Sequence, residues 1–162
     1  MADVQTIERH QSAAPTDIKK MLVAALIGAV VGAIAWGGGL LISRFIIEPV
    51  FCATPDSASV CEVRDITSFN IALVLASFVG LLAMVRARVY RPLLISIAAA
   101  VTAWGMVAWL AGEPWFIGLL AAVSIAALAY AFYAWVAQLK SFIAALIITL
   151  IVAVGLRFLW NL

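Results

Sequence analysis

The sequence predicts an all-α fold, a polytopic integral membrane bundle of about five transmembrane helices that run mostly up and down antiparallel. Three observations predict it. Hydrophobic residues make up 67% of the chain and charged residues only 11%, whereas a soluble domain is roughly half apolar and a quarter charged. The apolar residues form five runs, each near the roughly 20 residues that cross a bilayer. Prolines and charges stand mainly between these runs.

The elements follow in chain order. Residues 1–17 are polar and lack the apolar density to pack, so we expect a disordered cytoplasmic tail. Residues 18–162 then form one transmembrane domain. Its predicted spans are residues 21–43, 68–85, 93–111, 115–137 and 142–160. For the first span the alternative is a signal peptide cleaved near Ala35, but the run stays apolar through Ile42, which favours a span.

The connections between spans are short, with one exception. Pro92 and Pro114 stand where a helix can begin without losing an internal hydrogen bond, so they open the third and fourth spans. Residues 44–67 form the only sizeable loop. Its apolar residues 45–47, 50 and 51 are expected along the membrane interface.

Basic residues set the orientation, because cytoplasmic loops carry an excess of Lys and Arg. With the N-terminus in the cytoplasm, seven of them fall on that side and three outside. The seven are Arg9, Lys19, Lys20, Arg86, Arg88, Arg91 and Lys140, and the three are Arg44, Arg64 and Arg157. We therefore expect a multi-pass protein of the cell membrane with loop 44–67 and the C-terminus outside. The net charge of +2 is too small to indicate nucleic acid as a partner.

The two cysteines, Cys52 and Cys61, lie in the predicted outer loop, where oxidation is allowed. We expect a structural disulfide; the alternative is a pair of reduced thiols. A membrane thiol oxidase needs a second cysteine pair to pass electrons onward, and this chain has only two cysteines. A zinc site needs further ligands. No metal and no cofactor is predicted.

Small residues recur at every fourth position in the first two spans, which is typical of helices that approach closely in a membrane. These helix-packing residues are Ala24, Gly28 and Gly32, and Ala72, Ala76 and Gly80. The run Gly37, Gly38 and Gly39 weakens its helix, because each glycine costs about 1 kcal/mol relative to alanine. It is either a site of close packing or a hinge.

Four hydroxyl residues fall near the middle of their spans: Ser77, Thr102, Ser124 and Thr149. They form either a polar path or hydrogen bonds within and between helices. Near the C-terminus, Arg157 and Trp160 are expected to anchor the last span at the interface, with a ligand or lipid contact of Arg157 as the alternative. Interfacial belts are predicted from Trp109, Trp115 and Trp160 outside and from Tyr90, Tyr130, Tyr133 and Trp135 inside.

No catalytic constellation or phosphate-binding loop is visible in the sequence, so no enzyme activity is predicted. The span interiors lack Asp, Glu, His and Lys, the groups that usually carry ion coupling. The expected function is a non-enzymatic accessory or scaffold subunit of a membrane complex, with the lipid bilayer and other membrane subunits, or a second copy, as partners. The alternatives are a small solute transporter or channel acting as an oligomer and, third, an intramembrane enzyme.

Overall fold

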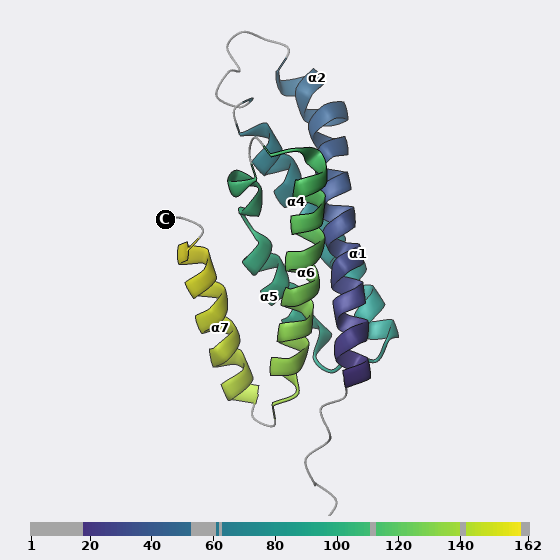
Figure 1. Ribbon diagram of the computed structural model, residues 1–162, viewed down its shortest axis with the longest axis vertical. Coiled ribbons are helices and arrows are strands. Elements are labelled where there is room, and N and C mark those ends of the chain that lie inside the picture. Colours follow the sequence, from purple (N-terminus) through teal and green to yellow (C-terminus); the bar gives the residue numbers. More distant parts are fainter. Residues whose placement is uncertain (1–17, 53–60, 62, 111–112, 140–141, 160–162) are drawn as a thin grey trace, which may run out of the picture.

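The computed structural model describes residues 18–52, 61, 63–110, 113–139 and 142–159 (Figure 1). The predicted tail, residues 1–17, and Trp160 lie outside these residues. The all-α prediction is confirmed, since every regular element in the described part of the chain is a helix. The long helices are α1 (Ile18–Ile42), α4 (Arg64–Arg86), α5 (Pro92–Ala103), α6 (Trp115–Ala137) and α7 (Phe142–Leu159).

The helix that begins with α1 extends well beyond the predicted first span. A π-helical turn, η2 (Ser43–Ile47), and a short helix, α2 (Glu48–Phe51), follow it without an intervening loop. At the other end of the predicted loop, α4 already begins at Arg64. The predicted loop 44–67 is therefore helical at both ends, because its apolar residues 45–47 continue the helix and Pro49 is tolerated in the first turn of α2.

The predicted third span, residues 93–111, is not one continuous helix. α5 ends at Ala103, Trp104 has an extended backbone, and a 3₁₀ turn, η4 (Met106–Trp109), follows. Gly105 between them has φ 86°, a left-handed conformation that glycine adopts at no steric cost because it lacks Cβ. The run of apolar residues predicted the span, but the break depends on this single backbone position.

Burial in the bundle is the reverse of that in a soluble protein. The interior is rich in small residues such as Ala24, Ala35 and Ala76, each at 0% exposure, while large apolar side chains such as Leu26 and Leu128 point outward. Such a surface suits hydrocarbon, where close backbone packing holds helices together. Four helical segments are long and apolar enough to cross a membrane, and the described part of α7 adds a shorter apolar helix. The chain is an integral membrane protein.

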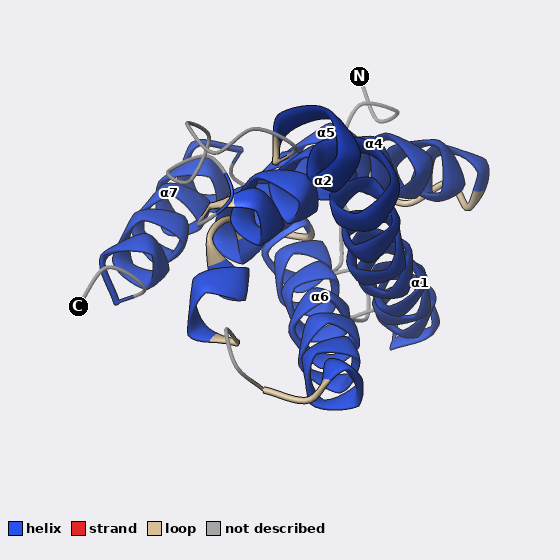
Figure 2. Ribbon diagram, turned by 90° about the horizontal axis from the view of Figure 1, so that it is seen from above, coloured by secondary structure: helices blue, strands red, loops and turns tan. Residues whose placement is uncertain are grey.

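α1 packs most extensively against α6 and then α4. α5 packs against α6 and α4, and α7 lies at the edge of the bundle against α5 and α6 (Figures 1 and 2). The start of α1, the α4–α5 turn, the end of α6 and the start of α7 lie at one end (Figure 1). We call the opposite end, which carries Cys52 and Cys61, the disulfide end.

Candidate functional site

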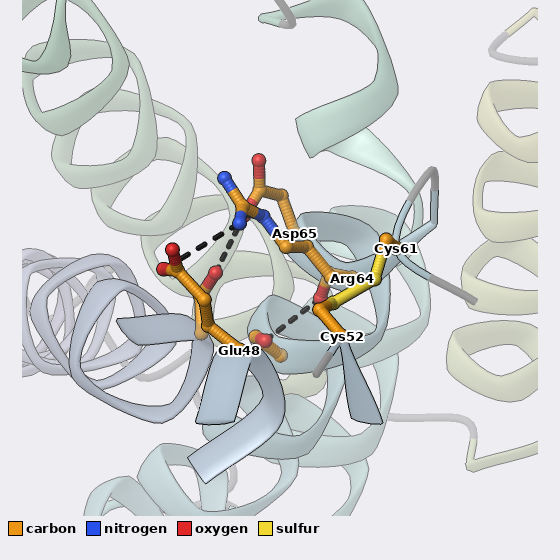
Figure 3. The surroundings of a disulfide bond; sticks show 7 residues. Glu48, Cys52, Cys61, Arg64 and Asp65 are labelled. Atoms are coloured by element: carbon orange, nitrogen blue, oxygen red, sulfur yellow. Dashed lines mark hydrogen bonds and ion pairs between the residues drawn. A yellow bond between two sulfur atoms is a disulfide. The ribbon is translucent and has the colours of Figure 1, made fainter. Parts of the chain in front are cut away.

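A disulfide joins Cys52, directly after α2, to Cys61, shortly before α4, with the two Cα atoms 5.7 Å apart (Figure 3). The predicted pairing is thus present in the structure. On the chain-entropy estimate a closed loop of this size stabilises the ordered state by about 2.5–3 kcal/mol. The bond holds the end of the first helical segment beside the start of α4.

Polar contacts reinforce this junction (Figure 3). Arg64 places Nη1 3.5 Å from Glu48 Oε2 and Nε 3.4 Å from Asp65 Oδ1. Ser43, in the π-helical turn, donates a 2.6 Å hydrogen bond to Asp65 Oδ1. Because the ion pairs are partly open to solvent, each contributes at most about 1 kcal/mol. They link the π-helical turn and α2 to the start of α4, where Asp65 lines a cavity.

The cavity at the disulfide end has a volume of about 270 Å³ and is partly open. Two carboxylate residues, Asp65 of α4 and Glu113 just before α6, line it together with aromatic and aliphatic side chains. The aromatic residues are Trp36, Phe69 and Trp115. These residues come from four separate parts of the chain, so their spacing in the sequence carried no signal of a shared site.

Trp36 is the most constrained residue of the cavity wall. Its indole Nε1 donates a 3.1 Å hydrogen bond to the Trp115 carbonyl oxygen. Its ring meets the Phe69 ring edge to face, with centroids 6.1 Å apart. It also lies directly over Gly118, where a Cβ atom would collide with the indole. The aromatic wall of the cavity is therefore formed by residues of α1, α4 and α6 that contact one another.

A second hollow, which we call the α4 groove, lies on the side of the bundle and has a volume of about 400 Å³. Asn70, Val74 and Trp104 are among its lining residues. The Asn70 amide oxygen is buried and has no hydrogen-bond partner among the described residues. Trp104, another residue that lines the groove, directly follows the last residue of α5. Asn70 is not among the site residues predicted from the sequence, although an amide within an apolar run is itself a signal.

The six helix-packing residues are all buried. A Cβ atom on Gly32 would lie 2.5 Å from the Ala122 carbonyl oxygen, and one on Gly28 would lie 2.6 Å from that of Ala126. Gly80 faces Val31 and Tyr130 in the same way. Small residues of the first two spans thus lie where α1, α4 and α6 meet.

The glycine run lies inside α1, which continues through it without a break. Gly37 has open space around it, whereas Gly38 faces Ala72 and Gly39 faces Phe69. Two of the three glycines therefore allow close packing of α1 on α4. A hinge at this position stays a prediction.

The structure does not gather the four central hydroxyls into one path. Ser77 donates a hydrogen bond to the Leu73 carbonyl oxygen one turn back, and Ser124 is exposed on the outer face of α6. Thr102 donates to the Ala98 carbonyl oxygen and lies 2.8 Å from it, and the Tyr133 hydroxyl lies 2.7 Å from the same Thr102 oxygen. The Thr149 hydroxyl oxygen is buried and has no partner among the described residues.

Two residues assigned to the inner aromatic belt have a different location. Tyr130 and Tyr133 are only 2% and 1% exposed and belong to the core between the helices. Tyr130 lies against Gly28 of α1, its hydroxyl lies against Gly80 of α4, and the Tyr133 hydroxyl contacts Thr102 of α5. Trp109, Trp115, Tyr90 and Trp135 are exposed, as a belt requires. Arg157 lies in α7, but its side chain is outside the described part.

The described residues contain no group of three His, Cys, Asp or Glu side chains that could hold a metal ion. No protein-family model, curated protein or solved structure matches the chain. The two hollows and the packing around them are therefore the features of the described structure that bear on function.

Proposed function

We propose that this protein is a non-enzymatic accessory or scaffold subunit that holds a transmembrane helix of a different membrane protein in the α4 groove. The observation that carries the proposal is Asn70, a residue that lines this groove and whose buried amide oxygen has no hydrogen-bond partner among the described residues. In hydrocarbon a polar group without a partner is costly, and an interhelical hydrogen bond relieves that cost.

The position of Asn70 suits contact with a second helix. It lies six residues beyond Arg64, roughly 9 Å along α4 at about 1.5 Å per residue. The lining residues Ile71, Val74 and Leu75 supply an apolar surface beside it. A partner helix with a Ser, Thr or Asn at the matching depth would cover these side chains and hydrogen-bond to the Asn70 amide after that side chain rotates toward the groove.

The hydroxyl pattern supports this proposal over the alternative of a small solute transporter or channel. Ser77 and Thr102 hydrogen-bond to their own helices, and Ser124 faces outward. The α1–α6 contact is closed by direct contact between glycines and backbone. These features are those of a packed bundle that presents a surface to a partner.

Photo-crosslinking tests the proposal in the native membrane. A photoreactive residue at Val74, which lines the groove, should give a discrete adduct with one other membrane protein. The same residue at Leu120, which is exposed on α6, is the control and should give no such adduct. Asn70→Leu should reduce the Val74 adduct about threefold, the equivalent of one membrane hydrogen bond of roughly 0.6 kcal/mol.

Three outcomes would contradict the proposal. Adducts from Val74 with lipid alone would show that nothing docks in the groove. An adduct with a second copy of this chain would replace the accessory role by self-association. Equal adduct yields from Val74 and Leu120 would show that the crosslinks come from non-specific contact with other membrane proteins.

The proposed location is the cell membrane, with the N-terminus in the cytoplasm. The α4–α5 turn, which contains Arg86, Arg88 and Arg91, lies at the same end as the start of α1 (Figure 1), and basic residues favour the cytoplasmic side. A reporter that is active only outside the cytoplasm should be active after Leu162 and inactive at Arg88. Activity at Arg88 would overturn this orientation.

A further inference from the structure

We propose that the cavity at the disulfide end binds a small organic cation, an ammonium group carried on an aromatic or short aliphatic body. The proposal is independent of the docking role of the α4 groove. It depends on three properties of the cavity: its size, its division into an acidic mouth and an apolar interior, and its aromatic wall.

The size of the cavity sets the size of the ligand. Its volume of about 270 Å³ exceeds the roughly 150 Å³ of an engineered apolar cavity that holds benzene. It lies just below the roughly 300–1,000 Å³ of typical small-molecule pockets. One ring with a short ammonium-bearing chain fits this range.

The exposure of the lining residues shows how such a ligand would lie. Phe69 and Val107 are 3% and 8% exposed and form the closed part of the cavity. The Asp65 side chain is 62% exposed, and Glu113 is exposed too, so the carboxylates stand at the mouth. A ligand with a cationic group at the mouth and an apolar body inside would match both parts of the cavity.

The charges at the mouth favour a cation. Asp65 uses Oδ1 for Ser43 and Arg64, whereas no contact with Oδ2 is seen among the described residues. Glu113 makes no ion pair with any part of the chain that the structure describes. At about 4 Å each carboxylate attracts an ammonium group, although solvent at the exposed mouth reduces that attraction to the modest strength of a surface ion pair.

The aromatic wall adds a contact that a neutral ligand does not receive. Trp36 and Trp115 line the cavity with Phe69, and the hydrogen bond from the Trp36 indole to the Trp115 backbone holds the two elements together. The face of a tryptophan attracts ammonium groups within roughly 6 Å. Carboxylates and indoles together select cations with an apolar body over metal ions, which prefer several oxygen ligands.

Two sources supply this chemistry: a free amine and the ammonium group of an ethanolamine lipid. The experiment uses phenethylammonium as the probe and 2-phenylethanol as its neutral analogue, with the purified full chain in detergent and binding followed by tryptophan fluorescence. Phenethylammonium should bind at least about tenfold more tightly than the alcohol. Equal affinities would overturn the proposal, as would no binding of the ammonium probe at millimolar concentration.

Matched variants locate the site. Glu113→Gln should weaken phenethylammonium binding about fivefold or more and leave the affinity for the alcohol unchanged. Glu48→Gln removes one acid at the same end that is not among the lining residues and reaches Asp65 only through Arg64, so its effect should be smaller than that of Glu113→Gln. Equal losses in the two variants would overturn the proposal, because they would report a general surface charge. The melting temperature of each variant confirms that it is folded.

Vesicles distinguish the two sources. In vesicles that contain phosphatidylethanolamine, competition with the soluble probe would assign the cavity to the lipid headgroup. Unchanged probe affinity relative to phosphatidylglycerol vesicles would assign it to a free amine. Both results support an ammonium site, and the comparison with the neutral alcohol decides whether the site exists.

Discussion

Two faces of α6 are attached to their neighbours in different ways. Against α1, the contact is made by glycines: Gly28 and Gly32 lie so close to the Ala126 and Ala122 carbonyl oxygens that a Cβ atom has no room. Against α5, the contact uses side-chain hydroxyls: Thr102 and Tyr133 are 2.7 Å apart. One face depends on the absence of atoms, and the other on a hydrogen bond.

The difference shows what each contact tolerates. A close backbone approach gains many small dispersion contacts and fails when a single methyl group is added. A membrane hydrogen bond contributes only about 0.6 kcal/mol on average, because the unfolded chain in the bilayer also finds partners. We therefore expect the glycine face to be the sensitive one.

The largest effect is predicted for Gly32→Ala. The new methyl group would lie 2.5 Å from a backbone oxygen of α6, which cannot move without moving the helix, so the variant should lose about 1–3 kcal/mol of stability. Gly37→Ala is the matched control on the same helix, with nothing within 4 Å of the new atom. It should gain up to about 1 kcal/mol from helix propensity. Thermal melting in detergent measures both, and similar melting temperatures would contradict the packing argument.

A smaller effect is predicted for the hydroxyl pair on the α5 face. Thr102→Val and Tyr133→Phe each remove one side of the 2.7 Å contact and nearly preserve volume. A double-mutant cycle should give a coupling free energy near 0.6 kcal/mol. A coupling free energy larger than the stability lost in Gly32→Ala would reverse the comparison. A coupling free energy of zero would show that the hydrogen bond does not stabilise the α5–α6 contact.

The smallest effect is predicted for Ser124→Ala, because this hydroxyl lies on the exposed outer face of α6. Stability should change by less than about 0.5 kcal/mol. Ser77→Ala should behave similarly, since its hydroxyl donates to the Leu73 carbonyl oxygen of its own helix. A loss of more than about 1 kcal/mol at Ser124 would indicate an intermolecular contact on this face. It would then point to a further partner surface.

Several features followed from the sequence alone because they depend on one segment at a time. A run of about 20 apolar residues favours the bilayer independently of the other segments of the chain, so the helical bundle was predictable. The disulfide was predictable too, since Cys52 and Cys61 are the only cysteines and lie in one short segment. The small residues at every fourth position in α1 and α4 belong to the same class, because they mark a helix face locally.

Other features were decided only when the helices packed. Lipid and protein interior are both apolar, so a transmembrane helix that is hydrophobic all round does not reveal which face turns inward. Tyr130 and Tyr133 could therefore be assigned to an interface belt, although the structure buries them. The break at Gly105 and the meeting of Asp65 with Glu113 around one cavity likewise depend on contacts between segments far apart in the chain. The sequence by itself determined which segments enter the membrane, and the tertiary structure decided which side chains face one another there, because burial in lipid and burial in protein have nearly the same free energy for an apolar residue.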